Sequence, residues 1–207
     1  MFVQSTAASV KANCAKATRA TATRAVLALA TSALVMGCGS SNESRYPMRY
    51  QKAVLAVSAA PVPAEAAQRF AGFFESVDQP DVAARVDALY GDNVYFSDTL
   101  FVTEDRAALT RHFERLNHSG AHIDVDVDDA VVSGENLYLR WRMRVTFPND
   151  GATPRSQTIG MTQLRFDESG RVRFQQDFWD STEGFYRQLP VLGWAIGRVE
   201  AQMSAEP

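Results

Sequence analysis

Three stretches after about residue 64 carry apolar residues at the spacing of an α-helix. Their apolar positions are Phe70, Phe73, Phe74 and Val77, then Val82, Val86, Leu89 and Tyr90, and last Leu109, Phe113 and Leu116. Steps of three and four residues place side chains on one side of a helix. Gly91 ends the second stretch, and Thr103 is suited to cap the third. The pattern therefore predicts three amphipathic helices, with a short extended run at 94–98 before the third.

The period changes to two after Gly120. Apolar and polar residues alternate over 122–128 and again over 137–147, where Trp141 and Met143 share one face. The other face carries Arg140, Arg142 and Arg144. A slip of one residue would bury these three arginines, so we expect the Trp141 face to turn toward the helices. Two more strands are predicted over about 157–166 and 172–179, joined by a turn at 167–170.

The last segment again has helical spacing, in steps of four and three. Its apolar positions are Phe185, Leu189, Leu192, Ile196, Val199 and Met203. Pro190 and Gly193 interrupt the series. We therefore expect a broken amphipathic helix that packs on the domain.

The N-terminus has the layout of a secretory signal peptide. The first 37 residues hold four basic and no acidic side chains, and an apolar run at 25–36 is too short to span a bilayer. Val35-Met36-Gly37-Cys38 resembles the lipobox of bacterial lipoproteins, which implies that Cys38 is lipidated and anchors the protein in the cell envelope, with Gly39 favouring the outer membrane. The alternatives are an ordinary leader, or a translation start at Met48 and a cytoplasmic protein.

These features divide the chain into a signal peptide at 1–37, the lipidated cysteine and a Pro-punctuated tether at 38–63, and one folded domain at 64–203. From Cys38 onward the chain has 17 bases and 24 acids, so a nucleic-acid partner is not expected. No dinucleotide, phosphate-loop or serine-hydrolase motif is present. The acidic run at 124–128 alternates like a strand rather than a calcium loop, and no third ligand accompanies His118 and His122. Neither a cofactor nor a metal is expected.

The order of helices and strands resembles the nuclear transport factor 2-like superfamily, and within it the SnoaL-like group, related to ketosteroid isomerases and polyketide cyclases. The matching segments are Tyr95-Phe96-Ser97-Asp98, Trp141-Arg142-Met143, Leu164-Arg165-Phe166-Asp167, Asp177-Phe178-Trp179-Asp180 and the segment 186–193. The resemblance implies an α+β fold in which a cone-shaped, curved antiparallel sheet wraps on three N-terminal helices, followed by the broken C-terminal helix. It implies no single reaction, because the fold carries several.

The sequence also departs from the pattern of this group. The group tends to carry proline after the aspartate of the first strand and histidines on the last two strands, where this chain has Thr99, Gln163 and Gln175. Imidazoles are the side chains best suited to proton transfer near neutral pH. Their absence favours a domain that binds without catalysis.

The candidate catalytic residues are Asp98 and Asp177, because burial would raise the pKa of a carboxyl group at a pocket. The alternative is that Asp98 caps the turn before Leu100 and that Asp177 pairs with an arginine (Arg140, Arg142, Arg144 or Arg173). Asp177 and Asp180 point to opposite faces of a regular strand, and the resemblance favours Asp177 and Trp179 at the pocket. The expected ligand-binding residues are Phe73, Tyr95, Trp141, Met143, Gln163 and Trp179.

Three functions stay open. The first, which the missing histidines favour, is a membrane-tethered domain that binds a small apolar or polycyclic ligand without catalysis. The second is an enzyme of the isomerase, cyclase or epoxide-hydrolase type that uses the pocket aspartates. The third is an interaction module that forms a homodimer through its open sheet face.

Overall fold

The computed structural model of the 207-residue chain describes residues 45–58, 60–148 and 155–204. The predicted signal peptide and Cys38 lie outside the described residues. The helices are α2 (Arg45–Ala56), α3 (Ala66–Glu75), α4 (Val82–Leu89), α5 (Arg106–His118), α6 (Ser181–Gly184), the 3-10 turn η2 (Tyr186–Gln188) and α7 (Pro190–Ser204). The strands are β1 (Tyr90–Ser97), β2 (Val102–Thr103), β3 (His122–Ser133), β4 (Asn136–Thr146), β5 (Ser156–Phe166) and β6 (Val172–Trp179).

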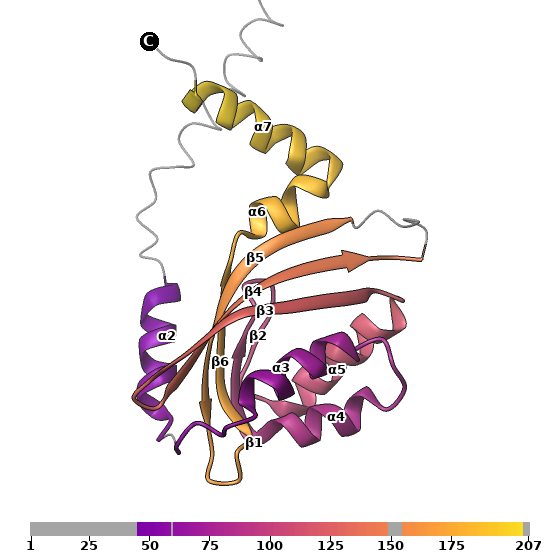
Figure 1. The fold of residues 1–207 in the computed structure, drawn as a ribbon. Helices are drawn as coiled ribbons and strands as arrows, with labels where there is room; N and C mark the ends of the chain where they lie inside the picture. Colours follow the sequence, from indigo (N-terminus) through magenta and orange to yellow (C-terminus); the bar gives the residue numbers. More distant parts are fainter. Residues whose placement is uncertain (1–44, 59, 149–154, 205–207) are drawn as a thin grey trace, which may run out of the picture. The chain divides into compact units, whose positions relative to one another are not determined.

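The strands form one open, curved sheet in the order β2-β1-β6-β5-β4-β3 (Figure 1). The predicted meander from β3 to β6 is antiparallel throughout. The first long strand, β1, pairs in parallel with β6, so the sheet is mixed rather than wholly antiparallel. The predicted α+β architecture is confirmed, with this one parallel pair as the difference.

Helices α3, α4 and α5 cover the concave face of the sheet (Figure 1). Buried side chains from these helices meet those of the inward strand positions in one core, which includes Phe73, Phe113 and Trp141. Arg140 and Arg142 are exposed on the opposite face. The predicted register of β4 is therefore confirmed.

Helix α2 covers part of the convex face, and it falls within the stretch that the sequence predicts as a tether. Ala53 and Val57 pack there with Tyr95 and Phe174 in a second core. The guanidinium of Arg165 donates to the carbonyls of Val54 and Val57, which satisfies groups at the helix C-terminus. The sheet is thus buried on both faces along β1 and β6.

The C-terminal segment is broken as predicted, into α6, η2 and α7. Pro190 is the first residue of α7, where its missing N–H and fixed φ are tolerated. The expected packing on the domain is observed for α6, in which Gly184 is buried, and not for α7, which contains no buried residue.

Candidate functional site

A cavity of about 360 Å³ lies between the concave face of the sheet and helices α3 and α5. Its walls are mostly apolar and include Phe70, Phe113, Val125, Trp141, Met143 and Trp179. Gly184, Phe185 and Leu189 of the C-terminal segment also line it. The polar side chains that reach the cavity include Asp98, His112 and Asp177. A volume of this size is in the range of small-molecule sites.

Asp177 is a buried carboxyl group on the inward face of β6, where it is 7 % exposed. Within the described ranges it forms no ion pair, and its predicted arginine partners lie elsewhere. Burial raises the pKa of Asp177 to about 7, the Asp98 charge adds to this increase, and hydrogen bonds from Thr162 and Gln175 oppose it. Asp177 therefore exists in both protonation states near neutral pH.

Neighbouring side chains fix the direction of the hydrogen bonds to Asp177. The Trp141 Nε1–H can only donate, and it donates to Thr162 Oγ1 over 2.9 Å. The Thr162 hydroxyl then donates to Asp177 Oδ1 over 2.7 Å. On the other side, Tyr90 donates to Gln175 Oε1, and the Gln175 amide donates to Asp177. Burial keeps the Tyr90 hydroxyl protonated, because it raises the pKa of Tyr90 well above its usual value.

Asp98 lies at the end of β1 and closes the following turn. Its Oδ1 accepts the backbone N–H groups of Leu100 and Phe101, and its Oδ2 lies 3.3 Å from His112 Nε2. The capping role is therefore confirmed, and the same carboxyl group lines the cavity. Thr99 has a φ of 79°, which proline cannot adopt, so the turn differs from one with proline after the aspartate.

His112 is a site residue that the sequence analysis missed. It projects from α5 into the cavity wall, stacks on Phe101 with ring centroids 4.3 Å apart, and contacts Asp98. The sequence contains a signal for it, because position 112 falls between Leu109, Phe113 and Leu116 on the apolar side of the predicted helix. A histidine on that side faces the interior.

The structure brings together five of the predicted site residues. Asp98, Trp141, Met143, Asp177 and Trp179 all line the cavity.

Three other predicted residues do not line the cavity. Phe73 is buried in the core below it. Tyr95 and Gln163 point to the convex face, where Tyr95 packs with Phe174 and Gln163 accepts a hydrogen bond from Tyr50 of α2. Both strand faces are buried here, so burial alone could not identify the inward residues. In the described part of the chain, no group of three metal-ligating side chains is present.

The model of the SnoaL-like domain family matches residues 70–175, slightly more than half of the chain, so this chain belongs to that family. The matched region runs from α3 to β6 and contains Asp98 and His112. A sequence comparison with curated proteins found no match.

Several solved structures are similar to this chain. An LEH-like epoxide hydrolase of M. tuberculosis has 17 % identity and a TM-score of 0.48, covering 64 % of this chain and 94 % of its own. An NTF2-like protein of unknown function from Exiguobacterium has 13 % identity and a TM-score of 0.48, over 56 % and 98 % of the two chains. A Catenulispora acidiphila protein with a ketosteroid isomerase-like fold has 14 % identity and a TM-score of 0.49, over 59 % and 91 %.

Proposed function

We propose that this domain is an enzyme that encloses a small, mostly apolar molecule and transfers a proton to or from it through Asp177. The observation that carries the proposal is a buried carboxyl group, without an ion pair among the described residues, at the wall of an apolar cavity. The histidines missing from the last two strands had favoured a domain without catalysis. Asp177 supplies a titratable group of another kind in the same part of the sheet.

The pKa of Asp177 suits proton transfer in either direction. A general acid or base is most effective when its pKa lies near the working pH, and the pKa of Asp177 is raised to about 7. Burial in an apolar site is one established way to keep a carboxylic acid protonated at neutral pH. The Thr162 and Gln175 donors also hold the carboxyl group in one orientation.

The cavity walls indicate the class of substrate. Aromatic and aliphatic side chains would bind a mostly hydrocarbon molecule, and the few polar groups would orient a single reactive oxygen or an acidic C–H. Ketones, enols and epoxides fit this description. Asp98 and His112 form a second pair that could exchange a proton on the same molecule.

The test compares wild-type protein with Asp177→Asn, which keeps the shape and removes the acid. Compounds that bind in the cavity are first selected from apolar ketones and epoxides. They are then incubated in deuterated water, and mass spectrometry measures deuterium incorporation and products. We expect wild-type turnover with a pH inflection near 7 and a loss of about 10²- to 10⁴-fold in the variant, with binding retained.

Thr158→Val is a matched control on β5, because the Thr158 hydroxyl donates to the Ile159 carbonyl, and Thr162 is the β5 residue opposite Asp177. Its turnover should equal that of the wild type. If wild-type protein binds several of these compounds and neither exchanges nor converts any of them, the domain is a ligand-binding protein without catalysis.

We also propose that the domain is held at the bacterial cell envelope through lipidation of Cys38. The support is the lipobox-like sequence at 35–38 and the preceding basic and apolar segments. Cys38→Ser should move the protein from the membrane pellet to the soluble fraction and abolish labelling by a palmitate analogue. Wild-type protein that begins at Met48 and is soluble in the cytosol would contradict this proposal.

A further inference from the structure

Helix α7 exposes a continuous apolar stripe. The stripe runs through Leu192, Ile196, Val199 and Met203 in steps of four and three, and Val191, adjacent to Leu192, lies at its edge. Val191 is 78 % exposed, Val199 54 % and Met203 81 %. An amphipathic helix of a soluble domain normally turns such a stripe toward the core.

The face that α7 turns toward the rest of the domain is small and polar. A side chain at position 193 would collide with the backbone of Arg187, so the contact needs a glycine. Glu200 forms an ion pair with Arg187 at 2.7 Å. The helix is therefore held by a glycine and an ion pair while its apolar side faces outward.

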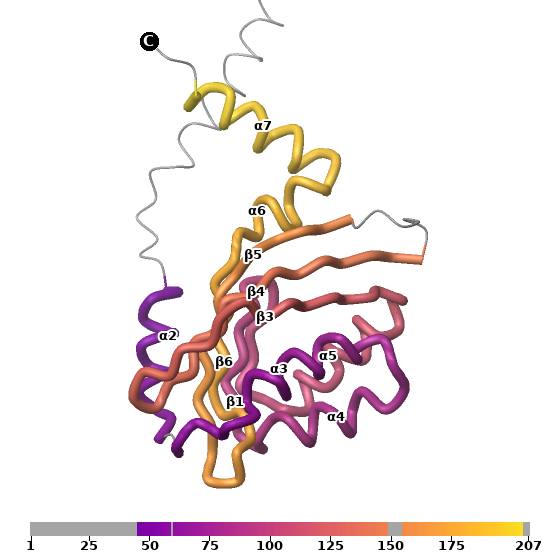
Figure 2. Tube along the Cα trace, in the orientation of Figure 1, coloured from indigo at the N-terminus to yellow at the C-terminus, as the bar shows by residue number. Residues whose placement is uncertain are grey.

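The stripe lies at the same end of the domain as the mouth of the cavity. Phe185 and Leu189, just before α7, line the cavity, and Phe185 is itself partly exposed. Ile159 near the start of β5 and Phe178 near the end of β6, the strand that α6 follows, add exposed apolar side chains. Figure 2 shows α6 and α7 following one another from this end of the sheet.

Helix α2 also begins at this end. The Tyr50 ring lies 6.0 Å from that of Phe178, three residues before α6, whereas the C-terminal end of α2 contacts Arg165 at the other end of β5. The chain therefore enters the domain beside the cavity mouth. Six residues lie between Cys38 and Arg45, and the seven Cα–Cα steps from one to the other span at most about 25 Å. A lipid on Cys38 would hold this end of the domain close to a bilayer.

The composition of α7 favours a lipid surface over a second protein chain. Trp194, 67 % exposed, lies one turn after Val191, beside that edge of the stripe, and the Arg198 guanidinium lies 5.6 Å from its ring. Tryptophan and arginine place an apolar body in lipid and a polar group in water at a bilayer surface. Among the described residues no helix is long and apolar enough to cross a membrane. A helix of 15 residues would instead lie in the plane of the interface.

We propose that the stripe of α7 binds the surface of a lipid bilayer, so that the mouth of the cavity faces the lipid. This contact is separate from the proposed lipid on Cys38. Because the domain carries an excess of acidic residues, we assign the contact to apolar insertion rather than to attraction by anionic headgroups. Entry of the substrate from the bilayer follows only if the proposed function is also correct.

The test uses the full chain with a protease site inserted between Ser41 and Asn42. Cleavage after folding removes the leader and Cys38, and the released domain is floated with phosphatidylcholine vesicles. We expect binding that is equal at about 0.1 M and about 1 M salt, because apolar insertion is not screened. The double substitution Val191→Glu and Val199→Glu should reduce the bound fraction at least about tenfold.

The matched control is Val131→Glu with Val132→Glu, which changes two exposed valines at the far end of β3. This control should bind vesicles like the wild type. As a second measurement, bromine-labelled lipids should quench the fluorescence of Trp194, and Trp194→Phe should remove the quenched component while buried Trp141 stays unaffected.

Three outcomes would overturn the proposal. The first outcome is that the released domain does not float with the vesicles. The second is that the stripe variant floats as well as the wild type. The third outcome is a dimer in lipid-free buffer that dissociates in the stripe variant, which would assign the stripe to a second copy of the chain. Each measurement is independent of turnover, so its failure is distinct from failure of the proposed function.

Discussion

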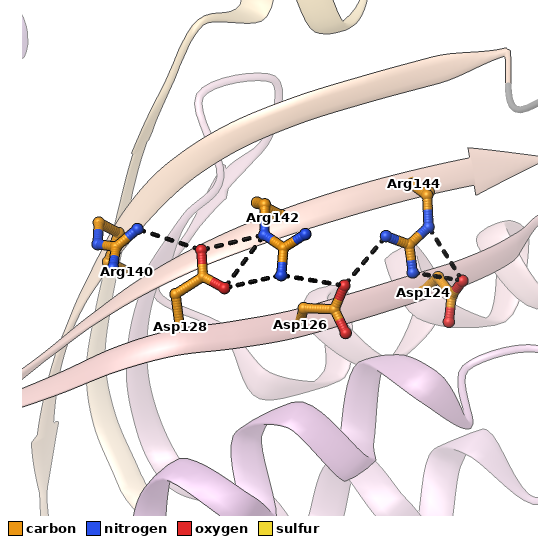
Figure 3. A network of polar contacts seen from close by, with 6 residues as sticks. All are labelled: Asp124, Asp126, Asp128, Arg140, Arg142 and Arg144. Atoms are coloured by element: carbon orange, nitrogen blue, oxygen red, sulfur yellow. Dashed lines mark hydrogen bonds and ion pairs between the residues drawn. The ribbon is translucent and has the colours of Figure 1, made fainter.

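Aspartates lie on both faces of the same sheet, paired with arginines on one face and buried on the other. On the convex face, three aspartates of β3 alternate with three arginines of β4 in a ladder that consists of Asp124, Asp126, Asp128, Arg140, Arg142 and Arg144 (Figure 3). On the concave face, Asp177 of β6 is buried at the cavity.

The ladder lowers the pKa of Asp128, the acid between Arg140 and Arg142. Arg142 donates to both oxygens of Asp128, at distances of 2.9 to 3.1 Å, and Arg140 donates to the same carboxylate. The hydrogen bond with Arg142 is the main reason that the pKa of Asp128 is lowered. Water remains in contact with this group, so the charged form is favoured.

Asp177 has hydrogen-bond donors but no cationic partner within the described ranges. Burial dominates, and its pKa rises to about 7. The two faces of the sheet differ in solvent exposure and in the ion-pair partners that they offer. This difference decides whether an aspartate is a structural anion or a titratable acid. The residue type is the same on both faces.

The largest expected effect concerns the pH dependence of stability. The Asp177 carboxyl loses its proton near pH 4 in the unfolded chain and near pH 7 in the folded one. The folded state thus binds more protons between these values, and stability falls as pH rises through this window. Urea denaturation should show that the wild type loses about 3 kcal/mol more than Asp177→Asn between pH 5 and pH 8.

The difference between the stability curves of the wild type and Asp177→Asn reports on Asp177 alone, because the two proteins share all other titratable residues. Carbon NMR of the Asp177 carboxyl provides a second measurement and should titrate near pH 7. Parallel stability curves for the two proteins would mean that Asp177 is ionised over the whole range from pH 5 to pH 8.

The second prediction compares side-chain packing on the two faces of the sheet. Gly160 lies under the Trp141 ring, and a side chain there would collide with that ring and approach Trp179. Gly160→Ala should therefore cost about 3 kcal/mol of unfolding free energy, measured in urea, as expected for overpacking. Ile159→Ala, one residue along on the exposed face, is the control and should cost well under 1 kcal/mol. Similar losses for both variants would show that the concave face is loosely packed.

A smaller effect tests the donors around Asp177. Thr162→Val removes the hydrogen bond to Asp177 and leaves the Trp141 N–H without its acceptor. We expect a loss of about 1–2 kcal/mol in thermal or urea unfolding. Because the Thr162 hydrogen bond lowers the pKa of Asp177, its removal should raise that pKa further. A lower pKa in the variant would mean that Thr162 does not donate to Asp177.

The sequence predicted the orientation of a strand correctly where one face of the sheet is exposed to solvent. In β3 and β4, polar and apolar residues alternate, and the predicted orientation of Trp141 and Arg142 is confirmed. The family resemblance also favoured the correct face for Asp177 and Trp179.

Prediction failed where both faces are covered. In β1 and β6 most residues are buried, and α2 packs on the convex side, so alternation could not assign Tyr95. Gln163 of β5 lies under the same helix. The helix itself has apolar side chains at steps of three and four, from Tyr50 to Val57, but Pro47 in its first turn and Pro61 and Pro63 after it favour a tether. The shape of the cavity depends on how side chains from elements far apart in the sequence pack together. No local sequence pattern contains this information.

The smallest expected effect concerns the ladder itself. Asp128→Asn removes the carboxylate that Arg140 and Arg142 share, while Asp129→Asn changes a neighbour that forms no ion pair in the described part of the chain. The lowered pKa of Asp128 means that its contribution is present above the pKa of the unfolded chain, about 4, and is lost as pH falls below that value. This direction is opposite to that of Asp177. Since the ladder is in contact with water, the difference between the two variants should be small at neutral pH and should shrink as salt is added. Urea denaturation at pH 7 and pH 3, with and without about 1 M salt, measures it. If Asp128→Asn lost stability mainly at high pH, or if salt left the difference unchanged, the ladder would resemble the buried site, and the contrast between the two faces would not hold.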